Sequence, residues 1–176
     1  RRRQLLEVQP NPAHFAIQQL ERKYHVSVIT QNVDDLHERA GSSQVVHLHG
    51  ELRKARSVKN ESLVYQWDKD LNLGDFCEEG GQLRPHIVWF GEEVPLLETA
   101  AILTQLADIV LIIGTSLQVY PAASLVSFAQ KNIPIYYIDP NPQINFELSV
   151  VKGLKVIDKK ASIGVVELVD SLLSEA

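Results

Sequence analysis

Apolar residues along the chain form short uninterrupted runs that alternate with segments of helical spacing. The runs are each long enough for a buried strand, and they cover residues 26–30, 45–49, 86–90, 109–113 and 135–138. Apolar residues recur every three or four positions in other segments, which predicts helices over residues 12–24, 34–39, 96–107, 122–131 and 163–173. Alternating strands and helices predict an α/β fold, a Rossmann-like doubly wound parallel sheet.

Two of the predicted helices carry signals at their ends. Asn11 can cap the first helix with its side chain, and Pro12 suits the first helical position because it has no N–H to leave unpaired. Gly41 follows the short helix at 34–39 and suits the left-handed backbone that often ends a helix.

Residues 51–82 interrupt the alternation of strands and helices. The segment is charged at first and then mixed in character, and it stands between two predicted strands of the sheet. We therefore expect a small inserted module at 51–82, with residues 1–50 and 83–176 forming the Rossmann-like domain. The apolar residues that could form the core of the module are Leu63, Val64, Tyr65, Trp67, Leu71 and Phe76.

The 176 residues suffice for one well-packed domain of ordinary composition, 45% hydrophobic and 22% charged. The net charge of −5 gives no reason to expect nucleic-acid binding, and no apolar run is long enough to span a bilayer. Cys77 is the only cysteine, so no internal disulfide can form, which favours an intracellular, cytoplasmic protein. Methionine is absent and the sequence opens on three arginines, so we expect the C-terminal part of a longer protein.

Polar side chains follow several predicted strands, at the edge where open parallel sheets bind ligands. Gln31, Asn32 and Asp34 leave the first strand within four positions. Asn and Asp are also common turn residues, so either one alone could be structural. Gly114-Thr115-Ser116 and Asp139-Pro140-Asn141 follow two later strands, where small and hydroxyl residues suit a phosphate or ribose contact.

A histidine ends the second predicted strand. His49 is followed by Gly50, which lets a ligand approach the backbone closely. Alternation places His47 on the same face as His49, so the spacing alone does not choose between them. Both could simply be satisfied by hydrogen bonds at the end of a strand. An imidazole that exchanges its proton near neutral pH also suits a general base.

Five motifs appear in an order that resembles the sirtuin family, the NAD-dependent protein-lysine deacylases. They are TQNVDDLH at 30–37, HLHG at 47–50, LRPHIVWFGE at 83–92, GTS at 114–116 and VYP at 119–121. The chain is most similar to the bacterial, class III desuccinylase-like subgroup. The resemblance implies NAD as co-substrate, acyl-lysine proteins as substrates, and nicotinamide and O-acyl-ADP-ribose as products. It leaves the oligomeric state open.

The resemblance also implies roles for individual residues. His49 would be the general base that takes a proton from a ribose hydroxyl of NAD, with Asn32 and Asp34 beside it at the nicotinamide end. The residues that would bind the cofactor are Gln31, Asn32, Val33, Asp34, Gly114, Thr115, Ser116, Asp139, Pro140, Asn141 and Ala161. The residues that would bind the substrate are Val88, Trp89, Phe90 and Gly91, together with Arg1, which would pair with an acidic acyl chain.

Two features of the family are missing. Its structural zinc is bound by two Cys-x-x-Cys pairs, whose positions here hold Ser57, Asn60, Cys77 and Gly80, so we expect no zinc. The glycine-rich turn that cradles the pyrophosphate, and the strand before it, would precede Arg1. We therefore expect this fragment alone to bind NAD weakly or to be inactive. ADP-ribosyl transfer to protein, or a non-catalytic NAD or ADP-ribose-binding module, are the alternatives.

Overall fold

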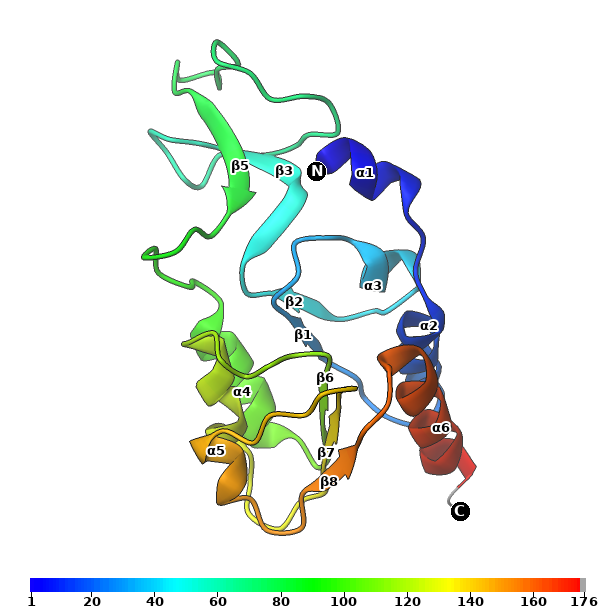
Figure 1. The fold of residues 1–176 in the computed structure, drawn as a ribbon. Coiled ribbons are helices and arrows are strands. Elements are labelled where there is room, and N and C mark those ends of the chain that lie inside the picture. The colour runs from blue at the N-terminus through cyan, green and yellow to red at the C-terminus, as the bar shows by residue number, and fades with distance from the viewer. Residues whose placement is uncertain (175–176) are drawn as a thin grey trace.

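The computed structural model describes residues 1–174, in which parallel strands lie between helices (Figure 1). The helices are α1 (Arg2–Glu7), α2 (Pro12–Gln19), α3 (Leu36–Arg39), α4 (Leu97–Leu106), α5 (Phe146–Ser149) and α6 (Ala161–Ser174), with 3-10 segments η1 (Leu20–Arg22) and η2 (Ala122–Phe128). The strands are β1 (Val28–Thr30), β2 (Val45–His47), β3 (Gly50–Ser57), β4 (Val64–Gln66), β5 (Leu83–Ile87), β6 (Val110–Ile113), β7 (Ile135–Ile138) and β8 (Lys155–Ile157). None of the helices within residues 1–174 has the length and apolar character that a bilayer crossing requires.

Helices cover both faces of the parallel strands, which confirms the predicted doubly wound α/β fold. β7 is buried along its whole length. Tyr136 and Ile138 pack against α2 and α6 on one face, and Ile135 and Tyr137 pack against η2 and α5 on the other. Alternate residues of one strand therefore join two separate hydrophobic clusters, as expected for a strand with helices on both sides.

The parallel strands form two half-sheets, β2-β1 and β6-β7-β8. Among residues 1–174 no backbone ladder joins β1 to β6, although residues of both strands line one cavity of about 840 Å³. β1 and β6 are therefore edge strands that border the same space, and their loops open at the same end of it.

The prediction that residues 86–90 form a buried strand of the parallel sheet is wrong. The strand in this region, β5, ends at Ile87 and pairs antiparallel with β3. Trp89 and Phe90 lie beyond it and are 54% and 98% exposed. A continuous apolar run reports hydrophobicity but not the partner strand, and here the run continues into a turn in which the N–H of Glu92 bonds the carbonyl of Trp89.

β3, β4 and β5 form a separate antiparallel sheet within residues 50–87, in the order β4-β3-β5. Its small core contains four of the six predicted residues, and the proposed division of the chain at 51 and 82 stays a prediction. The members of this core are Leu63, Tyr65, Trp67 and Leu71, packed around Ala55, Cys77 and Leu83. Val64 and Phe76 were wrongly expected there, being 39% and 60% exposed. Val64 alternates with Tyr65 along β4 and so faces away from the core.

The predicted cap of α2 is present. Asn11 Oδ1 accepts a hydrogen bond from the N–H of Ala13 at 2.9 Å, and His14 Nδ1 accepts one from the N–H of Asn11 at 3.1 Å. The helices predicted at 12–24 and 122–131 are shorter, because α2 gives way to η1 and the second region is the 3-10 segment η2. In η2 the hydroxyls of Ser124 and Ser127 each bond the carbonyl three residues earlier, which competes with α-helical pairing.

α6 packs so closely on the sheet at Gly164 that a side chain has no room. A Cβ there would lie 2.8 Å from Ile138 Cγ2 and 3.0 Å from Ile157 Cγ2. Gly164→Ala should lower the free energy of unfolding by about 1–3 kcal/mol in chemical denaturation, although alanine favours a helix by ~1 kcal/mol. Ser171→Ala, at an exposed position of the same helix, is the matched control and should change stability little. A Gly164→Ala protein as stable as the wild type would contradict this close packing.

Candidate active site

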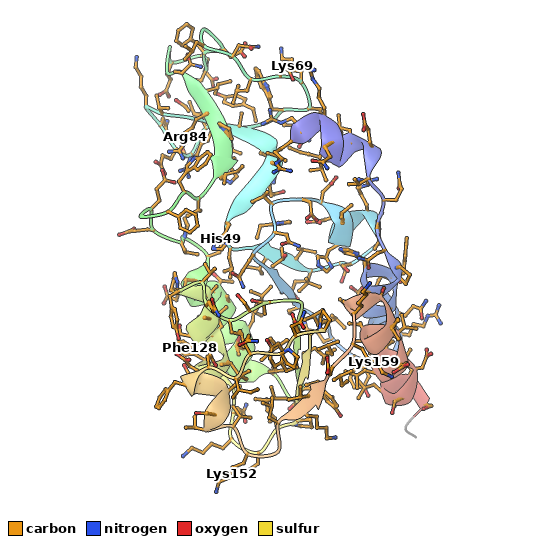
Figure 2. All side chains as sticks on the ribbon, in the orientation of Figure 1. His49, Lys69, Arg84, Phe128, Lys152 and Lys159 are labelled. Atoms are coloured by element: carbon orange, nitrogen blue, oxygen red, sulfur yellow. The ribbon has the colours of Figure 1, made fainter. Side chains whose placement is uncertain are left out.

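His49 lies just beyond the end of β2, between the antiparallel sheet and the parallel strands (Figure 2). Parallel pairing sets Thr30 opposite His47, so the segments that leave β1 and β2 run side by side. There the Nδ1–H of His49 donates a hydrogen bond to the backbone carbonyl of Gln31 at 3.0 Å. Because a carbonyl can only accept, Nδ1 carries the proton, and Nε2 of the neutral ring is left with its lone pair.

Gly50 allows the chain to turn at this point. Its φ is +79°, and a Cβ there would lie 2.1 Å from the backbone oxygen of His86. The N–H of Val88 donates to the carbonyl of His49 at 3.0 Å. The segment that contains β5 therefore lies directly against His49 and Gly50, and only glycine fits at position 50.

The loop after β1 connects the two half-sheets through Gln31. Its Nε2 lies 3.5 Å from Thr115 Oγ1, on the loop that follows β6. The side chain of Asn32 is exposed, while its N–H bonds the hydroxyl of Thr30 at 3.1 Å. The amide of Asn32 is thus free to contact a ligand while its backbone is held.

The next two residues of this loop have structural contacts. The carbonyl of Val33 accepts a hydrogen bond from the N–H of Leu52 on β3 at 2.7 Å. Asp34 Oδ1 accepts one from the N–H of Leu36 at 3.1 Å and so starts the turn into α3. The turn role considered for Asp34 is therefore present, and it leaves the second carboxylate oxygen for other contacts.

The cavity between the half-sheets brings together five of the predicted cofactor residues. These are Gln31, Asn32, Gly114, Thr115 and Ala161. His49 adjoins them through its hydrogen bond to Gln31. The predicted residues that do not line this cavity are Val33, Asp34, Ser116, Asp139, Pro140 and Asn141.

The loops after β6 and β7 differ in how they could meet a ligand. Gly114 has a φ of +59° and nothing within 4 Å of the place where a side chain would stand. The carbonyl of Thr115 is held by the hydroxyl of Tyr137 at 2.9 Å. Asp139 Oδ1 accepts the N–H of Asn141 at 2.8 Å, which makes a tight turn at the end of β7. The first loop offers open backbone, and the second offers the remaining oxygen of a half-buried carboxylate.

The predicted substrate segment 88–91 is anchored by a residue that sequence reasoning missed. Glu92 accepts the N–H of Trp89 at 3.0 Å and pairs with Arg84 at 2.7 Å and Arg56 at 3.4 Å. The hydrogen bond from Arg84, with that of Trp89 and the charge of Arg56, lowers the pKa of Glu92. The only sequence signal was an acid directly after Gly91. This anchor leaves Trp89 and Phe90 exposed next to His49.

The positions that hold zinc ligands in other members of the resembled family are joined here by hydrogen bonds. The thiol of Cys77 donates to Ser57 Oγ at 3.2 Å, and the N–H of Gly81 donates to Cys77 Sγ at 3.2 Å. Ser57 Oγ also accepts the N–H of Lys59 at 3.1 Å. A buried hydroxyl and thiol thus satisfy the turns directly.

A second group of potential ligand atoms comes from Glu38, His47 and Glu51, which lie within 4.8 Å of one another. His47 Nε2 bonds Glu38 Oε1 at 2.6 Å, and Glu51 pairs with Lys54 at 2.6 Å. Because these atoms are already paired with protein groups, we assign none of them to a metal.

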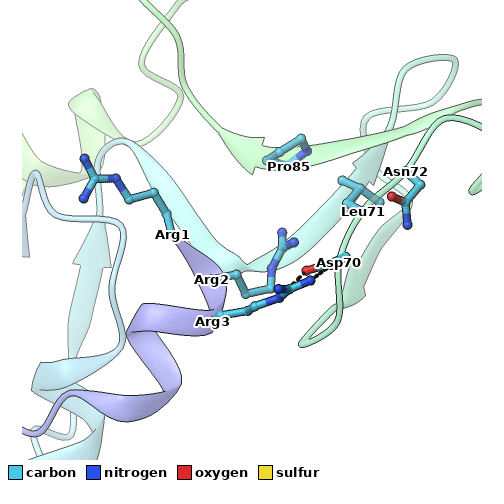
Figure 3. Close-up of a pocket in the computed structure, with 7 residues that line it drawn as sticks. All are labelled: Arg1, Arg2, Arg3, Asp70, Leu71, Asn72 and Pro85. Atoms are coloured by element: carbon cyan, nitrogen blue, oxygen red, sulfur yellow. Dashed lines mark hydrogen bonds and ion pairs between the residues drawn. The ribbon is translucent and has the colours of Figure 1, made fainter.

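Arg1 borders a different, shallower pocket of about 460 Å³ (Figure 3). Arg2 donates to the carbonyl of Leu52 at 2.8 Å, and Arg3 forms an ion pair with Asp70. Arg1 turns away from both and donates to the side chain of Gln4 at 3.3 Å (Figure 3). Its guanidinium is exposed and available to an anionic group.

Comparison with known proteins agrees with this geometry. The model of the Sir2 family matches residues 1–121. This chain belongs to the Sir2 family. An "NAD-dependent protein deacylase" of Helicobacter pylori is 64% identical over 140 residues, which are 80% of this chain and 60% of that protein. One of Bacteroides thetaiotaomicron is 48% identical over 179 residues, 98% of this chain and 75% of the relative.

Solved Sir2 structures share the fold. A Sir2 homologue in complex with NAD aligns with a TM-score of 0.84 and 36% identity over 96% of this chain and 67% of that chain. A Sir2–p53 peptide–NAD+ complex aligns with a TM-score of 0.74 and 31% identity over 98% of this chain and 72% of that chain. The present chain thus spans about 60% of the length of the Helicobacter pylori relatives that it matches.

We predict that the purified protein contains no stoichiometric zinc and that a chelator leaves its Tm unchanged, because a single thiol cannot replace four ligands. Cys77→Ala should lower the Tm by removing the sulfur that bridges Ser57 and Gly81. Cys77→Ser is the matched control, since its hydroxyl can keep both hydrogen bonds. One zinc per chain by elemental analysis would contradict the prediction.

Proposed function

We propose that this chain is the catalytic part of an NAD-dependent protein deacylase that acts on acyl-lysine. The observation that carries the proposal is the hydrogen bond from His49 Nδ1 to the carbonyl of Gln31, at 3.0 Å. It fixes the tautomer in which Nε2 can accept a proton, beside a loop whose Asn32 amide is exposed. The printed names of the relatives in Helicobacter pylori and Bacteroides thetaiotaomicron support the same activity.

In this proposal His49 Nε2 takes a proton from a ribose hydroxyl, so that the hydroxyl oxygen can accept the acyl group. The imidazolium that forms is stabilised by the Gln31 carbonyl at Nδ1. Asn32 and Asp34 orient groups at the nicotinamide end. NAD, when bound, would supply the ribose and the nicotinamide leaving group, and the products would be the free lysine of the protein, nicotinamide and O-acyl-ADP-ribose.

The residues present fit an NAD molecule. Among the residues that line the cavity, Gln31, Asn32 and Thr115 place polar groups where β1 and β6 end. Gly114 leaves open backbone at its edge, Thr115 offers a hydroxyl, and Ala161 puts a small side chain at the start of α6. Val33 and Ser116 flank this site, and Asp139, Pro140 and Asn141 would meet the ribose at the adenosine end.

The substrate side of the proposal uses the segment Val88–Gly91. Its backbone contacts His49 through the Val88 N–H, and its Trp89 and Phe90 side chains are exposed. An extended peptide could add to this segment by main-chain pairing, with the acyl-lysine directed toward His49. A cytoplasmic location belongs to the same proposal, because the unpaired thiol of Cys77 suits a reducing compartment.

The first experiment tests the base. In the protein that contains this chain, His49→Ala should reduce deacylation of an acetyl-lysine peptide by about 10²–10⁴-fold, because the general base is removed. Mass spectrometry would follow loss of the acyl group and appearance of nicotinamide. Asn32→Ala should impair turnover more than ADP-ribose binding, measured by calorimetry, because ADP-ribose lacks nicotinamide. The control Lys152→Gln changes an exposed residue that does not line the cavity, and it should leave turnover unchanged.

Two outcomes would reject the assignment. An increase in the mass of the peptide would indicate ADP-ribosyl transfer instead. Full activity in His49→Ala would remove His49 from the role of base.

Acidic acyl groups give a separate prediction about Arg1. A succinyl carboxylate that loses water needs a charged partner, and a guanidinium offers two parallel hydrogen bonds. Arg1→Met should therefore depress desuccinylation at least tenfold more than deacetylation, as measured by kcat/KM on paired peptides. Arg3→Met is the control, since Arg3 is already paired with Asp70. Equal effects of Arg1→Met on both substrates would show that Arg1 does not bind the acyl carboxylate.

A further inference from the structure

Two histidines contact successive carbonyls of the loop that carries Asn32. His49 Nδ1 lies 3.0 Å from the carbonyl oxygen of Gln31, and His47 Nδ1 lies 3.4 Å from that of Asn32. Since His47 is the last residue of β2, it links the end of this strand to the loop after β1. The proposed function uses His49 and leaves His47 without a role.

His47 has an acceptor on each of its two ring nitrogens. Its Nε2 lies 2.6 Å from Glu38 Oε1, and the side chain is almost completely buried. A carboxylate and a carbonyl can both only accept, so both contacts are made at once only when both ring nitrogens carry a proton. A neutral His47 must give up one of them.

We propose that Glu38 and His47 form a positioning pair that holds the backbone at Asn32, so that the loop is ordered when His47 is doubly protonated and loosens when it loses a proton. The inference rests on the proposed function, because it concerns the same loop. Neither residue needs to touch substrate. The pair would act through the placement of Asn32, next to the base.

The charges around His47 favour its protonated form. Glu38 on α3 and Glu51 on β3 are the acids that favour it, although Glu51 is also paired with Lys54. His37, also on α3, opposes a charge on His47 when His37 is itself charged. Burial works to lower the pKa of His47, but the hydrogen bond and charge of Glu38, with smaller help from Asn32 and Glu51, outweigh it and raise the pKa. Burial works to raise the pKa of Glu38, but the hydrogen bond and charge of His47, together with a backbone hydrogen bond and the charge of His37, outweigh it and lower the pKa.

The sign of the pH dependence follows from these shifts. His47 has a raised pKa in the folded state, so its contribution is complete below its unfolded pKa and is lost as the pH rises through the folded value. Glu38 has a lowered pKa, so its contribution is present above its unfolded value and is lost as the pH falls. Activity should therefore fall at alkaline pH as His47 loses its proton.

The test measures kcat and KM for NAD from about pH 6 to about pH 9 in the protein that contains this chain. The wild type should lose kcat on the alkaline side. Glu38→Gln keeps an acceptor but removes the charge, so its alkaline loss should begin at lower pH. His47→Gln cannot titrate, so it should lose the alkaline limb and show a kcat roughly 10- to 100-fold lower at all pH values. The profile of Lys152→Gln, at an exposed residue that does not line the cavity, should overlay that of the wild type.

The outcomes separate positioning from mere stability. A His47→Gln profile with the shape of the wild-type profile would overturn the proposal. So would a Glu38→Gln profile in which the loss of kcat at high pH begins at the same pH as in the wild type. If the wild type does not deacylate at all, the proposed function fails, and the pair is then judged by the NMR titration of His47. A titration midpoint that is raised in the wild type and falls in Glu38→Gln would support the pair, and an unshifted midpoint in both would overturn it.

Discussion

The contact on which the site depends is the approach of Gly50 to the backbone of β5. A Cβ at residue 50 would lie 2.1 Å from the carbonyl oxygen of His86, so the two segments meet backbone to backbone. The N–H of Val88 then donates a hydrogen bond to the carbonyl of His49 and completes this contact. His49 is therefore held on both sides of its own peptide, and its ring is directed to Gln31 by the parallel register of β1 and β2. A side chain at position 50 would clash with the backbone of β5, so the two strands pair this closely only with glycine there.

The space between the half-sheets gives the site its second wall. β1 and β6 both end in polar loops, and Gln31 and Thr115 approach to 3.5 Å across the mouth of the cavity. The floor of the cavity consists of the apolar side chains of the two strands, with those of α2 and α4. Gln31, Asn32 and Thr115 stand where the two strands end. This arrangement arises because parallel strands present their carboxyl ends, and hence their loops, on one side of the sheet.

Local patterns predicted the elements whose signals are local, and failed where the partner is distant in the chain. The cap at Asn11 needs only neighbouring residues, whereas the strand expected at 45–49 ends at His47, two residues before His49. The prediction placed the run at 86–90 in the wrong sheet. Its hydrophobicity does not distinguish a buried parallel strand from a strand that pairs with Gly50 and is followed by an exposed Trp89. The residues that the site needed and the pattern did not single out, Glu38 and Glu92, are charged side chains whose roles come from partners nine residues away or in another strand. Charge on a turn or helix is the commonest surface pattern, so it carries no signal until the fold places the partner.

The junction between the two sheets also explains how a sheet with a single cysteine can support the site. α1 ties the antiparallel sheet to the parallel part, since Arg2 donates to carbonyls at Leu52 and Lys69, while Arg39 of α3 donates to carbonyls at Leu5 and Val8. Leu52 is in turn bonded through its N–H to Val33, in the loop beside Asn32. The first residues of β3 are thus held by the helix, by the loop and by β5, independently of the turn at Cys77 at the far end of the sheet. The orientation of His49 then depends on the first residues of β3, where these hydrogen bonds converge. The hydrogen-bonded turn at Cys77 needs only to keep the small core of the antiparallel sheet packed.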